Sequence, residues 1–158
     1  MRQGVRIGVD VGRARVGVSR SDRDGLLATP VETIQRASVE PVARLRELAA
    51  ELGAVEAVVG LPISLSGGDT PSTQDAREMA AQLAAALPVR LVDERLSTVT
   101  ASAGMRASGK STRQQRATID QAAAVVILQH ALDSERASGR APGELLTDGD
   151  AVAQREED

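Results

Sequence analysis

The order in which strand-like and helix-like segments follow one another is the feature that most restricts the possible folds. Apolar residues alternate along VRIGVDVG at 5–12, and ARVGVSRSDRDGLLATPVETI at 14–34 predicts two further strands joined by a turn at SDRDG. Three strands in a row, with no helix between them, favour an antiparallel meander at the start of the chain.

Helices and strands alternate in the next part of the chain. The expected segments are a helix at 38–53, a buried strand at 55–62, a helix at 71–87 and a strand at 88–94. Ser38 is expected to cap the first of these helices, and Gly53 to end it. Strand–helix–strand units add parallel strands to a sheet, so the prediction is an α/β fold: a central mixed five-stranded sheet with helices on its faces.

A last helix is predicted at 118–136, where TIDQAAAVVILQHALDSER is apolar on nearly all sides and therefore buried. Thr118 and Gln121 have the spacing of a capping box, which places Asp120 in the first turn of this helix. Before it, LSTVTASAGMRA at 96–107 predicts a short helix, followed by a basic loop.

Charge is distributed unevenly along the 158 residues, whose formal net charge is −3. Residues 143–158 hold six acidic side chains and one arginine, so the preceding part carries a net charge of +2. We therefore expect a single domain at 1–137 and a disordered acidic tail at 138–158. No apolar run is long enough for a membrane span and the chain starts without a secretory signal, which predicts a cytoplasmic protein with no membrane contact.

Two residue classes are missing from the sequence. The lack of cysteine excludes disulfides, thiol catalysis and thiolate metal sites. The lack of Phe, Tyr and Trp removes the platforms on which unstacked bases are read, so a nucleic-acid partner would be held through phosphates and shape. Between positions 95 and 119 five bases occur without an acid: Arg95, Arg106, Lys110, Arg113 and Arg116. This segment could grip a phosphate backbone, although a solvated loop explains the charge run equally well.

The stretch GMRASGKS at 104–111 matches the nucleotide-binding pattern G-x-x-x-x-G-K-S/T. In a true phosphate loop a strand ends at the first glycine and a helix starts at the lysine. Here the nearest predicted strand ends ten positions before Gly104, and too little chain follows position 111 to complete such a sheet. ATP is therefore not expected as a ligand.

Three acidic residues at the ends of predicted elements suggest an active site. Asp10 ends the first strand, Glu94 ends the strand at 88–94, and Asp120 begins the last helix. If neighbouring strands carry the first two, all three can converge at one edge of the sheet. Crowded carboxylates repel one another unless cations lie between them, and hard oxygen ligands suit Mg²⁺ or Mn²⁺. Two such ions about 4 Å apart support phosphodiester hydrolysis.

Each acid also has an ordinary structural explanation. Asp10 is compatible with a turn, and Asp120 with the favourable dipole of a helix N-terminus. Asp93 and Glu94 point to opposite faces of their strand, so one of them is compatible with a solvated position. Taken together, and with the basic segment between the second and third, the three acids favour a metal-dependent nuclease.

Four segments in sequence order resemble the YqgF family, also called RuvX: IGVDVGRARVGVS, VVGLPISLSGG, VDERLST and IDQAAAVVIL. The resemblance covers nearly all of residues 4–135. Members of this family are described as Holliday-junction resolvases and as nucleases of precursor 16S ribosomal RNA, within the RNase H-like superfamily. The resemblance implies an RNase H-like fold and places the family's acidic residues at Asp10, Glu94 and Asp120.

The same interpretation assigns phosphate contacts to Arg13 and Arg15, and to Arg95 unless it only neutralises the neighbouring acids. The expected partners are a four-way DNA junction or precursor ribosomal RNA, and paired cuts in a two-fold symmetric junction call for a homodimer. Two alternatives stay open. One is a nucleotide-binding protein, because GVDVGRARVGVS also resembles the phosphate hairpin of the actin, hexokinase and Hsp70 superfamily; the other is a non-catalytic module that acts on RNA polymerase or the ribosome.

Overall fold

A computed structural model describes residues 1–64, 66–93 and 112–147, with the backbone alone for 112–120. Its elements, in chain order, are β1 (Arg6–Val11), β2 (Arg15–Ser21), β3 (Ala28–Gln35), α1 (Pro41–Leu52), β4 (Glu56–Leu61), α2 (Pro71–Leu83), β5 (Val89–Asp93), α4 (Thr112–Ser138) and β6 (Glu144–Leu146). None of the helices in these ranges is both long and apolar enough to cross a membrane.

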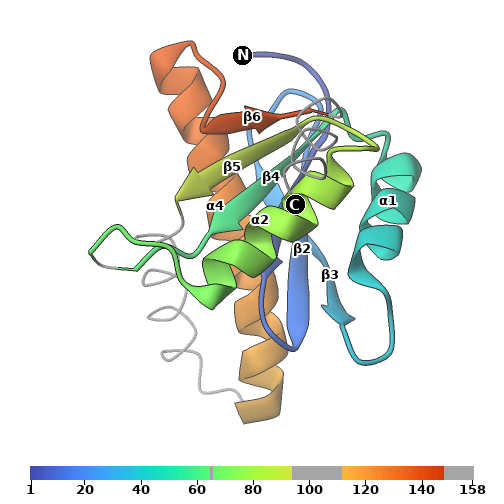
Figure 1. Cartoon of the computed structure of the whole chain (residues 1–158). Helices are drawn as coiled ribbons and strands as arrows, with labels where there is room; N and C mark the ends of the chain where they lie inside the picture. Colours follow the sequence, from blue (N-terminus) through green and yellow to red (C-terminus); the bar gives the residue numbers. More distant parts are fainter. Residues whose placement is uncertain (65, 94–111, 148–158) are drawn as a thin grey trace.

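The strands form one sheet in the order β3-β2-β1-β4-β5-β6. The pairs β1–β2 and β2–β3 are antiparallel, and β1–β4 and β4–β5 are parallel, which confirms the predicted meander with parallel additions. In Figure 1, α1 and α2 lie on one face of the sheet, and the long α4 lies across the other. The predicted α/β fold is confirmed.

A sixth strand corrects the predicted count of five. β6 pairs antiparallel with β5, and its Leu146 lies opposite Val89 and is 5 % exposed. We expected disorder from residue 138 onward, and this is wrong for 144–146. A three-residue strand is too short to show alternation in sequence, and it forms because the edge of β5 offers hydrogen-bond partners and the core accepts a leucine. Residues 148–158 lie outside the described part of the chain, so their disorder stays a prediction.

Alternation along β1 divides its side chains between the two faces. Ile7, Val9 and Val11 belong to the larger core cluster, which includes residues of α1 and α2. Gly8 lies against α4, and Asp10, two residues further along the strand, therefore shares the α4 face. With no aromatic residue in the chain, valine, leucine, isoleucine and alanine supply most of the packing on both faces.

Of the two helix ends predicted for α1, the C-terminal one is confirmed and the N-terminal one is wrong. Gly53 ends the helix in a left-handed conformation with φ +64°, as predicted. The N-cap is Glu40 and not Ser38: its carboxylate accepts from the amides of Val42 and Ala43, at 3.2 and 2.7 Å. Pro41 explains the difference, because it fits the first helical position and fixes where the helix starts.

The last helix is longer than predicted, which removes the expected capping box. Residues 112–117 are already helical, so Thr118 lies inside α4, and the Gln121 side chain donates to Thr33 Oγ1 on β3 at 3.0 Å. The apolar pattern starts only at Ile119, but the preceding arginines, glutamines and alanine have high helix propensity and extend the helix toward the N-terminus.

Candidate active site

The carboxyl ends of the parallel strands β1, β4 and β5 lie at one edge of the sheet. Asp10 is half-buried near the end of β1, and β5 ends at Asp93, directly before Glu94. β4 lies between these two strands, so the expectation that neighbouring strands carry the acids is wrong. Two strand spacings of about 4.8 Å separate β1 from β5 by roughly 10 Å. Asp10 and the last residue of β5 thus lie at the same edge of the sheet, with β4 between their strands.

α4 crosses this part of the sheet in close contact with β1 and β2. A Cβ atom at Gly8 would lie 2.7 Å from Leu128 Cβ and 2.9 Å from the Ala124 carbonyl oxygen. The buried hydroxyl of Ser19, which lies opposite Gly8 in the sheet, donates to the same carbonyl at 2.7 Å. The absence of a side chain at Gly8 and the small one at Ser19 let the helix backbone approach the sheet.

Position 120 lies one helical turn before Ala124, on the same stripe of α4. It is in the third turn of the helix as described, not in the first. The dipole effect falls off within the first turn, so the dipole explanation for an acid at this position is wrong.

Most other predicted site residues fall where the structure does not describe side chains. Glu94, Arg95, Arg106 and Lys110 lie outside the described residues, as does the phosphate-loop match at 104–111. Two more basic residues, Arg113 and Arg116, lie on the helical backbone of α4 instead of the predicted loop. Among the described residues no three carboxylate or histidine side chains gather into a metal cluster. Since two of the three expected ligands are not among them, the triad stays a prediction.

The hairpin between β1 and β2 carries Arg13, and Arg15 begins β2. Gly12 donates its amide to the Arg15 carbonyl at 2.9 Å, and a Cβ atom at Gly12 would lie 2.6 Å from that oxygen. The tight turn therefore explains Gly12 without any ligand. Arg13 is exposed and Arg15 is half-buried.

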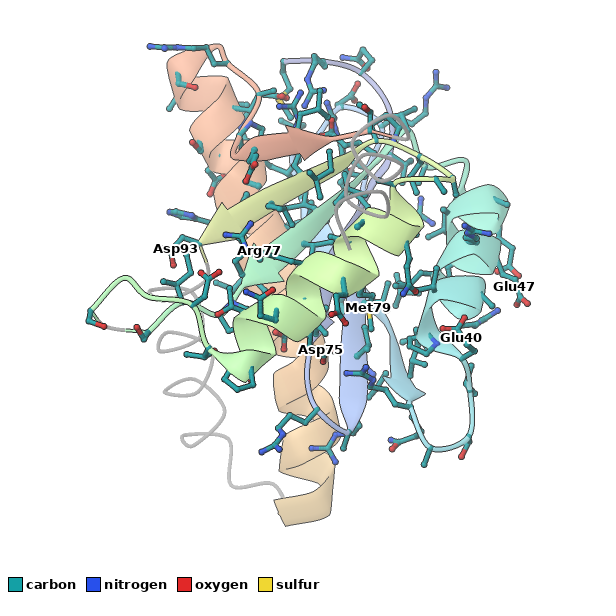
Figure 2. The ribbon with its side chains drawn as sticks, viewed as in Figure 1. Glu40, Glu47, Asp75, Arg77, Met79 and Asp93 are labelled. Carbon is teal, nitrogen blue, oxygen red and sulfur yellow. The ribbon has the colours of Figure 1, made fainter. Side chains whose placement is uncertain are left out.

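Arg13 lines a cavity of about 410 Å³ together with four residues that the sequence did not single out: Arg36, Pro71, Ser72 and Asp75. Arg36, just after β3, donates to the Gly12 carbonyl at 2.8 Å and to both carboxylate oxygens of Asp75, at 2.6 and 3.1 Å. These hydrogen bonds to Asp75 raise the pKa of Arg36. Figure 2 shows Asp75 on the side of α2 toward the β1–β2 hairpin.

The loop after β4 lies at the same edge of the sheet. Its end is fixed by a capping box between Thr70 and Thr73, and the Thr73 hydroxyl also donates to the Pro62 carbonyl. Within the loop the Ser64 hydroxyl accepts from the Gly68 amide at 3.0 Å. Hydrogen bonds within the loop thus fix the positions of its serine and threonine side chains at the carboxyl edge of the sheet.

The sheet order and the helix packed on β1 and β2 define an α/β protein of the RNase H-like class. A solved structure titled "T. thermophilus RuvC in complex with Holliday junction substrate" superposes with a TM-score of 0.53, covering 84 % of this chain and 96 % of that one. At 15 % sequence identity this likeness concerns the fold alone.

The family is shown by sequence. A family model described as "RuvX: Holliday junction resolvase" matches residues 4–134, and the chain belongs to this family. A protein of Clavibacter sepedonicus is 57 % identical over an alignment of 150 residues that covers 92 % of this chain and 93 % of that protein. One of Streptomyces coelicolor is 58 % identical over an alignment of 149 residues that covers 91 % of this chain and 89 % of that protein. Both are named "Putative pre-16S rRNA nuclease". The chain is accordingly a nuclease, as its sequence predicted.

Proposed function

We propose that the protein is a divalent-metal-dependent endonuclease whose ions are held by Asp10, Glu94 and Asp120. The observation that carries the proposal is the packing of α4 on Gly8. α4 runs antiparallel to β1, because Arg6 lies 3.4 Å from Glu135 near one end of the contact while Gly8 meets Leu128 and Ala124 further along the strand.

The geometry of strand and helix then supports a meeting of Asp10 with position 120. The step from Gly8 to Asp10 advances about 6.6 Å along the strand. The step from Ala124 back to position 120 advances about 6 Å along the helix axis, toward the same edge. Each position shares the face of its element with a contacting residue, Gly8 or Ala124, which supports a meeting of the two at the carboxyl end of β1.

Alternation along β5 selects between the two acids at its end. Leu91 belongs to the core on the α1–α2 side, and Asp93 shares its face. Val92 packs on the α4 side, and the next residue of that face is position 94. Figure 2 shows Asp93 at the end of β5. We therefore assign the metal-binding role to Glu94 rather than to Asp93.

The donor set fits a hard divalent cation. It consists of three carboxylates, the chain has no cysteine, and its single histidine, His130, is an exposed residue of α4 ten positions beyond Asp120. Bound there, a pair of Mg²⁺ or Mn²⁺ ions supplies an activated water and a charge that stabilises the leaving oxygen.

The protein's own residues hold and orient the substrate. Asp10, Glu94 and Asp120 would hold the ions, and Arg13 and Arg15, in and after the hairpin that follows Asp10, offer guanidinium groups to phosphates of the substrate strand. The basic residues from Arg95 onward extend that contact along the backbone. A chain without aromatic residues has no platform for unstacked bases, so recognition rests on phosphates and on the shape of the nucleic acid.

The substrate we propose is structured nucleic acid, either a four-way DNA junction or precursor 16S ribosomal RNA. The description of the family supports the first and the names of the relatives support the second. The protein would act in the cytoplasm. Paired cuts in a junction require two copies arranged with two-fold symmetry, whereas trimming of RNA does not.

Cleavage of a synthetic four-way junction and of a precursor 16S RNA, side by side with Mg²⁺, Mn²⁺ or chelator, tests the proposal. Loss of one metal-binding carboxylate removes several kcal/mol of transition-state stabilisation, so Asp10→Asn should lower the rate about a thousandfold or more. It should leave folding and substrate binding largely intact. Asp93→Asn, a neighbouring acid on the other face, is the matched control and should keep its activity. An active Asp10→Asn protein, or cleavage in chelator, would refute the assignment.

A further inference from the structure

The cavity beside the β1–β2 hairpin collects charged groups from three separate parts of the fold. Arg13 comes from the hairpin, Arg36 from the end of β3, and Pro71, Ser72 and Asp75 from the first turns of α2. We refer to it as the Arg13–Arg36 cavity. Asp75 lies on the same face of α2 as Ser72, three residues earlier. The ion pair between Asp75 and Arg36 forms one side of the cavity.

The two arginines differ in how they are held. Arg36 is fixed by Gly12 and by Asp75, and its side chain is 25 % exposed. The Arg13 guanidinium is exposed and has no ion-pair partner among residues 1–64, 66–93 and 112–147. With one carboxylate against two guanidinium groups, the cavity has a net positive charge, and the N-terminal end of α2 adds its positive dipole.

The position of the cavity relates it to the candidate active site. Three residues of extended chain span at most about 10 Å, so Arg13 lies within this distance of Asp10. Asp10 faces α4, whereas Asp75 and the cavity belong to the side covered by α2. A nucleic-acid strand cleaved at Asp10 would have to pass the hairpin to reach the cavity. The distance of about 10 Å between Asp10 and Arg13 corresponds to about three nucleotides at the rise of a duplex, about 3.4 Å each.

We propose that the Arg13–Arg36 cavity is a second phosphate subsite, which binds a phosphodiester of the substrate strand within about three nucleotides of the cleaved bond. The inference rests on the proposed nuclease function and adds the path of the strand. Guanidinium groups match the geometry of phosphate oxygens and can donate two parallel hydrogen bonds. Arg36 is already oriented by Asp75, and Arg13 is the group that closes on the phosphate.

Binding, measured by fluorescence anisotropy in chelator so that no cleavage occurs, tests the subsite. Loss of a charge-assisted contact should make Arg13→Ala bind a labelled DNA junction about tenfold more weakly at low salt. It should also lower the slope of log affinity against log salt by about 0.9, the value for one phosphate. Arg23→Ala removes an exposed arginine from the turn between β2 and β3, away from the cavity, and should change neither quantity by as much.

Substrates with single neutral methylphosphonate linkages locate the contact. Each linkage within three nucleotides of the cleavage point is replaced in turn. One of them should weaken binding of the unmodified protein about as much as Arg13→Ala does, and should cost the Arg13→Ala protein nothing further, because both changes remove the same interaction. If every replacement costs the two proteins equally, the subsite is refuted.

Inorganic phosphate distinguishes a strand phosphate from a free one. If the cavity binds free phosphate instead, Arg13→Ala should weaken phosphate binding in calorimetry. Its affinity for the junction and the salt dependence of that affinity should then equal those of Arg23→Ala, and this result would refute the proposal. The proposed function fails differently: Asp10→Asn would still cleave, while the binding differences at Arg13 could persist. If the unmodified protein binds neither junction nor precursor RNA, both proposals are overturned.

Discussion

At the scale of single residues, Arg44 shows how one side chain couples an edge strand to a helix. It donates to both carboxylate oxygens of Glu32 on β3, at 2.8 and 2.9 Å, from its place on α1. These hydrogen bonds from Arg44 hold the pKa of Glu32 below its usual value of 4.5. The carboxylate is therefore stabilised in the folded state relative to the unfolded chain.

This pair predicts a pH-dependent effect of Glu32→Gln. Because the folded-state pKa is lowered, the charged carboxylate contributes stability above about pH 4.5, and the contribution is lost as the pH falls through the folded-state pKa. The variant should be less stable than the unmodified protein at pH 7, and the difference should shrink toward pH 3. Urea unfolding at the two pH values measures it.

Glu47→Gln provides the control, since Glu47 contacts the same arginine at 2.9 Å but is 63 % exposed. Solvent screens an exposed pair, so its effect should be small. A stability difference for Glu32→Gln that does not change between pH 7 and pH 3 would contradict the role of the carboxylate charge.

The sequence identified residues whose role follows from local pattern and missed those defined by distant pairing. Gly53 was predicted as a helix end because a left-handed residue there favours glycine. Arg36 and Asp75 carry no such signal: they are 39 residues apart, and only the packing of α2 beside the hairpin brings them together. Glu40 was missed as a cap because Ser38 is the more common type of capping residue.

At the scale of elements, the contact of α4 with the β1–β2 pair positions the candidate active site. The helix backbone approaches so closely that Gly8 has no room for a side chain. The same contact sets the height of position 120 relative to Asp10. A change at Gly8 should therefore affect stability and activity together.

Gly8→Ala should destabilise the protein by about 1–3 kcal/mol, the usual cost of overpacking a buried site. The new methyl group would meet Ala124 and Leu128 and force α4 outward. Chemical denaturation measures the stability, and cleavage by the protein that stays folded should also fall. Gly68→Ala is the control, because a Cβ atom there would lie at least 3.6 Å from its nearest neighbours. Equal stability of the two variants would argue against the close packing.

The boundaries of α4 show why pattern alone misplaces an element. The apolar pattern of the sequence begins at Ile119, and the sequence therefore predicted a start at Thr118. Residues 112–117 are helical although they carry no apolar pattern, and their high helix propensity accounts for the longer helix. Position 120 therefore lies inside the helix and not at its start. The helix dipole no longer accounts for an acidic residue there, which favours the proposed role of Asp120 in the site.

At the scale of the whole molecule, a cluster of charged side chains, most of them buried, joins the first residues of the chain to the end of α4, at the part of β1 farthest from Asp10. Arg2 donates to both oxygens of Glu56 at 3.0 Å and to Glu135 at 2.7 Å. Arg6 reaches Glu135 at 3.4 Å, and Arg90 reaches Glu56 at 3.2 Å. The cluster thus connects the first residues, β1, β4, β5 and the end of α4.

The global arrangement could be predicted because connectivity restricts whether successive strands pair antiparallel or parallel. Three adjacent strands form a meander, and strand–helix–strand units add parallel strands whose carboxyl ends share an edge, which is where Asp10 lies. The insertion of β4 between β1 and β5 and the short β6 could not be predicted, because neither changes the order of patterns along the chain. The charge cluster also could not be predicted from the sequence, because its members lie up to 133 residues apart.

Glu135→Ala tests whether this cluster supports the whole fold. The Arg6 side chain is only 2 % exposed, and without Glu135 it would keep the Gly4 carbonyl at 3.0 Å but lose its carboxylate partner. Removing one partner of a buried ion pair costs about 3–5 kcal/mol, which should appear in urea unfolding. Glu78→Ala, at an exposed position of α2, should change stability by less than about 0.5 kcal/mol. Because the cluster lies at the other end of β1, the folded Glu135→Ala protein should retain metal-dependent cleavage. A loss of cleavage while the protein stays folded would mean that the two ends of α4 are coupled more tightly than their separate contacts imply.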